Sequence, residues 1–296
     1  MIDPPGQTMI DPALRIGSVE LAVGDVPRSA EFYERVLGLP LLSTEGDRAE
    51  LGHDRDRPAL VLTGIAHPTP VPPASTGLFH VAWLHPSRAA LAASVRRVVG
   101  QRWPLEGASD HGVSEALYLS DPDGLGIEIY ADRPREQWER PPGGHGVRMV
   151  TLPLDLEDLL AQDAGGHSPL TPPQTVVGHV HLKVSDVPRA AAFYGGALGL
   201  EEQARMPSAA FLSAGGYHHH VGLNSWQSEG AGPPPDSSPG LRDVRFELGD
   251  AGAVEELERR LSDDGPASVA RAGDGALSVR DPDGQLLEFA APDGAG

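Results

Sequence analysis

The sequence predicts an α+β protein built from four units, each with the order strand, helix and three further strands. Three observations support this expectation. The second half of the 296-residue chain repeats the first, each half divides again into two similar parts, and apolar residues alternate with polar ones where strands are expected. At this length two domains of ordinary size are the natural expectation.

The repeat is clearest at the start of each copy. Residues 17–28 read GSVELAVGDVPR, and residues 178–189 read GHVHLKVSDVPR; both strings are followed by Phe-Tyr and then by Leu-Gly-Leu. Asp25 and Asp186 stand where a helix N-cap belongs, with proline in the first turn, and the glycine of Leu-Gly-Leu ends each helix. The turn Asp-Pro-Asp-Gly at 121–124 also recurs in the second copy, so the chain contains two copies of one domain.

The expected elements follow in order. In the first copy they are a strand and helix over 16–39, strands near 49–51 and 59–62, a strand at 78–83, a helix at 88–99, and strands at 115–120 and 126–130. In the second copy they are a strand at 178–184 with its helix, a strand at 217–224, a strand at 241–248, a helix at 254–261, and strands at 276–280 and 286–289. The segment between the copies is rich in proline and glycine, so it is predicted to be a linker with a short helix at 155–162.

Composition excludes several functions. Lys and Arg total 23 against 42 Asp and Glu, and the formal net charge of -19 argues against binding to nucleic acid or to anionic membranes. The chain has no cysteine, so any metal site must use nitrogen and oxygen ligands. No apolar run approaches 18 residues, and residues 1–5 lack the character of a signal peptide, so a cytoplasmic protein is expected.

Histidines and a carboxylate gather in the second copy. Val180 and Leu182 alternate with His179 and His181, so both imidazoles are expected on the face of the strand turned away from the core. In a strand over 217–224, the same alternation places His218 and His220 on that face, and Glu288 lies between two apolar residues of the last strand. Two imidazoles and one carboxylate on one sheet face predict a metal site.

Four such units with these motifs resemble the vicinal oxygen chelate superfamily, which includes glyoxalases, extradiol dioxygenases and antibiotic-resistance proteins. The resemblance implies two tandem domains of cupped mixed sheet at 12–134 and 175–292, joined by the linker 135–174. Within the chain, ASDHGVSEALY at 108–118 and GGYHHH at 215–220 resemble the two-domain catechol-2,3-dioxygenase branch.

In that superfamily the ligands lie on the first and last strands of each module. The corresponding positions in the second copy are His179, His220, Asp243 and Glu288. Those in the first copy are Ser18, Ala59, His80 and Glu128. Two positions of the first copy cannot be strong ligands, so the metal is expected in the second copy, and His80 with Glu128 is interpreted as a vestigial pair.

Two imidazoles and one carboxylate with open positions are typical of non-haem Fe(II) oxygenases. The implied cofactor is Fe2+, with Mn2+, Ni2+ or Zn2+ as alternatives, and the implied substrates are a catechol and O2. The implied reaction is ring cleavage beside the vicinal hydroxyls, with His181 or His218 as the base that accepts a catechol proton.

Three alternatives stay open at this point. If Asp243 is a ligand, the site has two histidines and two carboxylates, closer to a glyoxalase-like lyase or isomerase; if it only orients a ligand, the dioxygenase prediction holds. A metal-free small-molecule binding protein of the same fold is the third class. His219 and His111 are expected to be structural, and a homodimer is left open.

Overall fold

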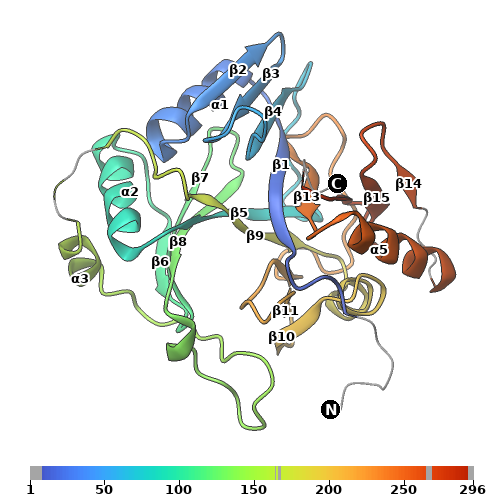
Figure 1. Cartoon of the computed structure of the whole chain (residues 1–296). Coiled ribbons are helices and arrows are strands. Elements are labelled where there is room, and N and C mark those ends of the chain that lie inside the picture. The colour runs from blue at the N-terminus through green and yellow to red at the C-terminus, as the bar shows by residue number, and fades with distance from the viewer. Residues whose placement is uncertain (1–8, 164, 166–167, 265–268, 293–296) are drawn as a thin grey trace.

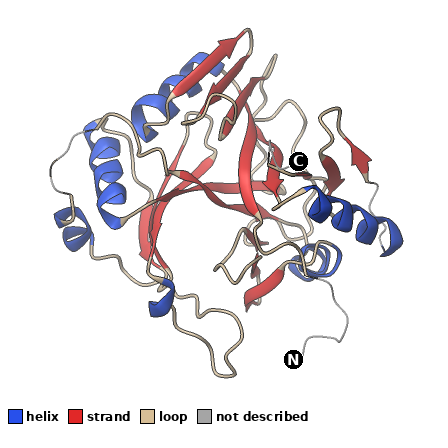
Figure 2. Cartoon of the chain, in the orientation of Figure 1, coloured by secondary structure: helices blue, strands red, loops and turns tan. Residues whose placement is uncertain are grey.

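The computed structural model describes residues 9–163, 165, 168–264 and 269–292. Residues 1–5, on which the argument against a signal peptide rested, lie outside these ranges. Strands fill the centre of the molecule and helices lie around them (Figure 2). The predicted α+β class is confirmed.

Two eight-stranded mixed sheets make up the described fold (Figure 1). Sheet A contains β1 (Arg15–Val23), β2 (Leu41–Glu45), β3 (Arg48–Leu51), β4 (Leu60–Gly64), β13 (Gly240–Glu247), β14 (Ala270–Arg271), β15 (Leu277–Arg280) and β16 (Leu286–Ala290). Sheet B contains β5 (Gly77–His85), β6 (Gly107–Asp110), β7 (Ser114–Ser120), β8 (Gly126–Asp132), β9 (Val176–Lys183), β10 (Glu201–Met206), β11 (Ala209–Ser213) and β12 (Val221–Asn224). The spatial orders are β14-β15-β16-β13-β1-β4-β3-β2 and β10-β11-β12-β9-β5-β8-β7-β6.

Each sheet takes one unit from each copy of the repeat. In sheet A, β1 pairs antiparallel with β13, which joins the first unit to the fourth; in sheet B, β5 pairs antiparallel with β9, which joins the second unit to the third. The four predicted units are therefore present, but their sheets cross the division between the copies. The boundaries 12–134 and 175–292 describe the sequence repeat and stay a prediction.

The helices begin where the caps were expected. They are α1 (Val26–Phe32) continued by the π-helical η1 (Tyr33–Leu37), α2 (Arg88–Gly100), the 3-10 turn η2 (Arg135–Gln137), α3 (Leu156–Ala161), α4 (Val187–Ala191) continued by the π-helical η3 (Ala192–Ala197), and α5 (Ala251–Asp264). The Asp25 carboxylate accepts the N–H of Arg28 at 2.9 Å, and Asp186 accepts that of Arg189 at 2.7 Å. Gly38 follows η1 with φ of 80°, the left-handed conformation that suits glycine.

The repeated Asp-Pro-Asp-Gly turns are tied to the repeated helices. Asp121 Oδ1 accepts the N–H groups of Asp123 and Leu125 at 2.8 Å each, and Tyr33 donates its hydroxyl to Asp121 Oδ2 at 3.3 Å. In the other copy Tyr194 donates to Asp281 at 3.1 Å. Burial raises the pKa of Asp121 to about 6. These turns therefore hold the sheets to their helices.

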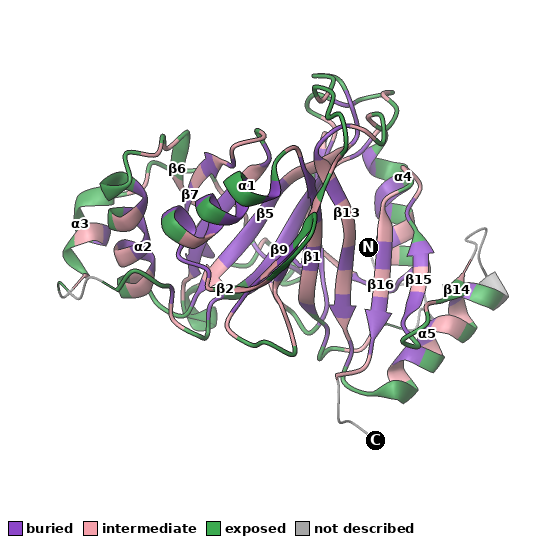
Figure 3. Cartoon of the chain, turned by 90° about the horizontal axis from the view of Figure 1, so that it is seen from above, coloured by how far each residue is buried: buried purple, intermediate pink, exposed green. Residues whose placement is uncertain are grey.

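The two faces of sheet B have different roles. Val81, Trp83 and Val180 are buried in the large apolar core between the strands and the helices. The opposite face carries Ala82 and Tyr130, which belong to a separate small buried cluster. Buried residues run through the central strands, whereas α2, α3 and α5 expose their outer faces (Figure 3). Because side chains alternate along a strand, His80 of β5 and His179 and His181 of β9 share the face of Ala82.

The linker packs against the sheet-B half. Asp110 forms a β-bridge with Leu152, and Arg88 of α2 bonds the carboxylate of Asp158 in α3 at 2.8 Å. The predicted helix near 155–162 is therefore present. Among the described residues, none of the helices combines the length and the apolar character needed to cross a membrane.

Candidate metal centre

Three buried side chains meet at the centre of sheet B. Ala82 of β5 lies opposite Glu128 of β8 on one side and opposite His179 of β9 on the other, and His80 precedes Ala82 by two residues on the same face. His80 Nε2 lies 3.0 Å and His179 Nε2 lies 3.3 Å from Glu128 Oε2. One possible ligand atom from each residue lies within 4.8 Å of the others. The small side chain of Ala82 leaves room for this cluster.

The cluster fits a divalent cation. Glu128 is 3% exposed, and within the described chain no Arg or Lys forms an ion pair with it. Burial lowers the pKa of His179 to about 4, so its imidazole is neutral and free to act as a ligand. His80 Nε2 and His179 Nδ1 are buried and, among the described groups, make no hydrogen bond of normal geometry. A buried carboxylate needs a compensating charge, which a cation held by these atoms would provide.

The predicted set of four ligands is not brought together. His179 lies in the cluster, but Asp243 is on β13 and Glu288 is on β16, both in sheet A. His220 lies before β12, where its Nδ1 accepts the N–H of Ala214 at 3.2 Å. The predicted grouping is corrected for two reasons: the third unit pairs with the second rather than the fourth, and the strand expected over 217–224 begins only at Val221.

His80 and Glu128, interpreted from the sequence as a vestigial pair, have a third candidate ligand beside them. These two residues complete the cluster with His179, so the candidate ligands come from both copies of the repeat. The equivalent face of sheet A lacks this chemistry, since Arg245 donates to Glu288 at 3.2 Å and to Asp274 at 2.7 Å. There the guanidinium supplies the positive charge that the sheet-B cluster lacks.

Asp243 behaves as a buried carboxyl group beside other acids. Burial first, and then the charges of Glu20 and Glu288, raise its pKa to about 7. The native state therefore binds more protons than the unfolded state between about pH 4 and pH 7, and the contribution of Asp243 to stability falls as the pH rises through that window. We expect Asp243→Asn to be more stable than the wild type by about 2 kcal/mol at pH 8, with little difference at pH 4.

Urea unfolding at the two pH values measures this change, and metal analysis of the same variant tests the ligand set. A normal metal content is expected. Loss of the metal from Asp243→Asn would restore Asp243 as a ligand and contradict the assignment to sheet B.

His181, which was predicted to be catalytic, lies beside the cluster. Its ring centroid is 5.0 Å from that of His80, and its buried Nε2 has no hydrogen-bond partner in the described chain. The other ring nitrogen bonds the backbone of Leu223, and burial lowers the pKa of His181. The imidazole is therefore neutral, and because the nitrogen bound to a carbonyl carries the proton, Nε2 is left as a proton acceptor.

His218, the second predicted catalytic residue, belongs to a hydrogen-bonded chain. Its Nε2 lies 2.9 Å from Asp132 Oδ1, and its Nδ1 lies 2.7 Å from His219 Nδ1. An ionised carboxylate only accepts hydrogen bonds, so His218 donates through Nε2 and accepts from His219 through Nδ1. His219 is buried with its ring centroid 4.0 Å from that of His179, so it has a place beside the cluster that the sequence did not predict.

Tyrosines form the rest of the surroundings. Tyr118 of β7 lies opposite Glu128 and donates its hydroxyl to His111 Nε2 at 2.6 Å, while His111 Nδ1 donates to the carbonyl of Val150 at 2.8 Å. Tyr130 and Tyr217 share a hydroxyl contact of 2.8 Å. His111 has the hydrogen-bonded structural role that was expected. The sequence did not predict that Tyr118 is part of the site. Its position ten residues before Glu128, across a hairpin turn, could have placed it there, but only if Glu128 were already known to belong to the site.

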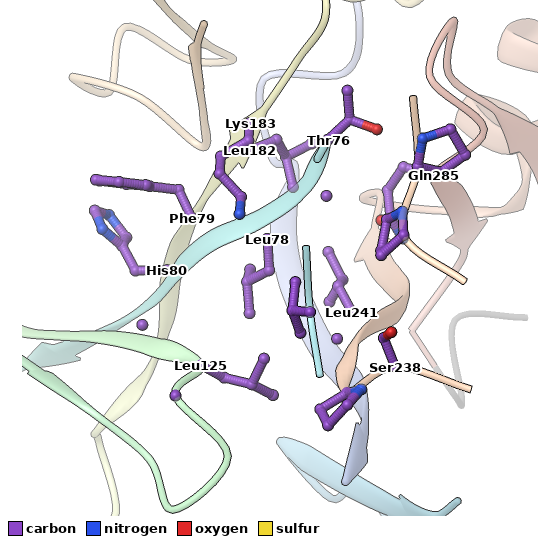
Figure 4. Close-up of a pocket in the computed structure, with 18 of the residues that line it drawn as sticks. Thr76, Leu78, Phe79, His80, Leu125, Leu182, Lys183, Ser238, Leu241 and Gln285 are labelled. Atoms are coloured by element: carbon purple, nitrogen blue, oxygen red, sulfur yellow. The ribbon is translucent and has the colours of Figure 1, made fainter. Parts of the chain in front are cut away.

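A cavity of about 820 Å³ reaches the cluster from one end of the two sheets. His80 and Tyr118 line it at the cluster, together with Phe79 and Leu125. Figure 4 shows His80 and Phe79 on one side and Leu241, Ser238 and Gln285 of the other half of the fold on the opposite side. The cavity therefore borders the cluster at His80, whereas Glu128 and His179 do not line it.

Comparison with known proteins agrees with this architecture. The family model for the Glyoxalase/Bleomycin resistance protein/Dioxygenase superfamily matches residues 15–129 and 176–289. Catechol-2,3-dioxygenase of Bacillus subtilis (strain 168) is 43% identical over 238 residues, which cover 79% of this chain and 82% of that protein. Glyoxalase I from Zea mays superposes with a TM-score of 0.55 at 18% identity, over 93% of this chain and 92% of that one.

A crystal structure of a Bacillus subtilis subsp. subtilis str. 168 protein superposes with a TM-score of 0.67 at 16% identity, over 97% of this chain and 87% of that one. The two structural matches support the fold alone. The family match covers both copies of the repeat, and it confirms the resemblance found in the sequence motifs. The chain belongs to the glyoxalase/bleomycin resistance protein/dioxygenase superfamily, as a two-copy member similar to catechol-2,3-dioxygenase.

Proposed function

We propose that this protein is an extradiol dioxygenase that cleaves the ring of catechol-type substrates beside the vicinal hydroxyls. The observation that carries the proposal is the buried group of two imidazoles and one carboxylate, His80, His179 and Glu128, which a small-molecule cavity borders at His80. This donor set suits Fe(II) in non-haem oxygenases. The relative with 43% identity is named for the same reaction class, which supports the choice.

Fe(II) held by these three residues would supply the Lewis acidity and the redox partner for O2 that ring cleavage requires. The chain itself supplies the substrate cavity and the base. Phe79 and Leu125 give the cavity an apolar wall beside His80, which suits a flat aromatic ring. The cluster is buried at 5% exposure or less, so bulk water is kept from the reacting atoms.

We assign the base to His181. Its Nε2 is unprotonated, buried and unpaired among the described groups, and its ring lies against His80. A catechol bound at the cluster would bring a hydroxyl proton to this side of the sheet. The chain Asp132, His218 and His219 lies on the other side of His179 and fixes the orientation of His219.

A glyoxalase-like reaction has less support from the site. That alternative depended on Asp243 as a fourth ligand, and Asp243 lies in sheet A rather than beside His179. It remains a distinct outcome of the experiment, as does a metal-free binding protein.

The test combines metal analysis with oxygen uptake on protein purified without oxygen or chelator. The wild type is expected to hold near-stoichiometric iron and to consume O2 with catechol, and His80→Ala is expected to lose both. His220→Ala is the matched control, since His220 lies outside the cluster, and it should retain both. Nickel, zinc or manganese without oxygen uptake would move the protein to the glyoxalase-like class. Absence of any metal would leave a binding protein.

A further inference from the structure

The lysine Lys183 has an unusual position. It is the only lysine of the chain and ends β9, in the row His179, His181 and Lys183 on the face that holds the cluster. On the neighbouring strands it pairs with Gly77 of β5 and with Asn224 of β12. Two residues of a strand span about 7 Å, so the backbone of Lys183 lies about 7 Å along β9 from that of His181. Its side chain lines the cavity (Figure 4).

No carboxylate compensates the ammonium group of Lys183 in the described chain. It forms no ion pair there, although the protein carries a net charge of -19. Burial alone lowers its pKa, because no neighbouring acid opposes the loss of solvation. The carboxylates that line the cavity have other partners in three cases: Asp123 with Arg28, Asp283 with Arg189, and Asp281 with Tyr194. The remaining two lining carboxylates, Glu106 and Asp236, form no ion pair with Lys183 among the described residues.

Aromatic side chains gather around His181, which lies between His179 and Lys183 in this row of β9. The ring centroids of Phe79 and His181 are 5.2 Å apart, and Trp226 lies 5.3 Å from Phe79 and 5.7 Å from His181. Trp226 follows Asn224, the strand partner of Lys183, by two residues and is 52% exposed. Phe79 lines the same cavity as Lys183 and His80, so a ring that enters this cavity meets an aromatic wall together with the ammonium group.

We propose that the substrate is a catechol that carries a carboxylate substituent, and that Lys183 binds this carboxylate while the two hydroxyls reach the His80, Glu128 and His179 cluster. The inference rests on the proposed function and adds the charge of the substrate to it. Lys183 is a specificity-determining residue, because an ammonium–carboxylate contact distinguishes an acidic catechol from a neutral one of the same ring size.

The experiment measures binding rather than turnover. Isothermal titration calorimetry without oxygen, on Fe(II)-loaded protein, compares catechol, 3,4-dihydroxybenzoate and 3,4-dihydroxyphenylacetate, whose carboxylates differ in reach by one methylene. The wild type is expected to bind at least one of the two acids about 10-fold to 100-fold more tightly than catechol, as a charge-assisted hydrogen bond predicts. Lys183→Met should lose this preference and keep its affinity for catechol, and Lys183→Arg should retain most of it.

Arg55→Met is the matched control, because it removes one exposed positive charge from the loop between β3 and β4 of sheet A. The preference of this variant for the two acids over catechol should equal that of the wild type. An unchanged preference in Lys183→Met, or a wild type that favours catechol, overturns the role of Lys183 while the dioxygenase proposal stands. A wild type that binds iron but none of the three compounds overturns both proposals. Retained binding of catechol by Lys183→Met shows that the variant is folded.

Discussion

Replacing Glu128 with glutamine is expected to remove the metal and with it all oxygen uptake. Glu128 is the only carboxylate of the three-residue cluster, and both imidazoles lie within 3.3 Å of its Oε2. An amide has nearly the same shape but no charge to balance a cation, so the affinity for metal should fall by more than about 100-fold. Metal analysis and oxygen uptake on Glu128→Gln measure the two losses.

Glu288→Gln is the matched control for this prediction. Glu288 is the counterpart of Glu128 in the sequence repeat, and in sheet A it accepts a hydrogen bond from Arg245. The control should keep its metal and its activity. The opposite pattern, with metal lost from Glu288→Gln and retained by Glu128→Gln, would return the site to the second copy of the repeat and refute the assignment to sheet B.

Replacing Gly126 with alanine is expected to destabilise the protein by about 3 kcal/mol, because two paired strands would have to move apart. Gly126 begins β8, and a Cβ atom there would overlap the carbonyl oxygen of Phe79 and lie 3.2 Å from the Cβ of His80. His80 and Glu128 stand on these two strands, so their separation should weaken metal binding as well. Urea unfolding and metal analysis of Gly126→Ala test both effects.

Gly124→Ala provides the comparison, because Gly124 lies two residues before Gly126, at the end of the Asp-Pro-Asp-Gly turn. Gly124 has φ of 81° and open space around its Cβ position, so alanine there should cost only about 1 kcal/mol of backbone strain. If Gly126→Ala proves no more harmful than Gly124→Ala, the close approach of β5 and β8 is not what positions His80.

The local parts of the fold could be predicted from the sequence. The caps at Asp25 and Asp186 and the shared face of His179 and His181 depend only on spacing along one segment, and the structure confirms them. The strand at β12 was predicted too long. The chain turns at Gly215 and Gly216 and bends again at His218 and His220 before β12 begins at Val221, so strand alternation does not apply to these two histidines.

The partner of each unit could not be predicted in the same way. Apolar residues such as Val180 and Val81 fix which face of a strand is buried, and that face is buried equally well whether the third unit pairs with the second or with the fourth. Pairing is decided by the fit of β5 against β9, which involves residues far apart in sequence. The predicted ligand set depended on this choice, which is why His179 was placed on its face correctly but grouped with Asp243 and Glu288, which lie in the other sheet.

The position of the cluster across the β5–β9 pair also affects how the protein is held together. His80 and Glu128 precede the linker and His179 follows it, so a cation bound by all three would act as a cross-link between the two halves of the chain. A ligand that binds only the folded state stabilises it by about 4 kcal/mol at a thousand times its dissociation constant. This free energy would stabilise the pairing of β5 with β9, where the two halves meet. Removal of the cation would therefore weaken the association of the halves before it destabilised the fold of either half.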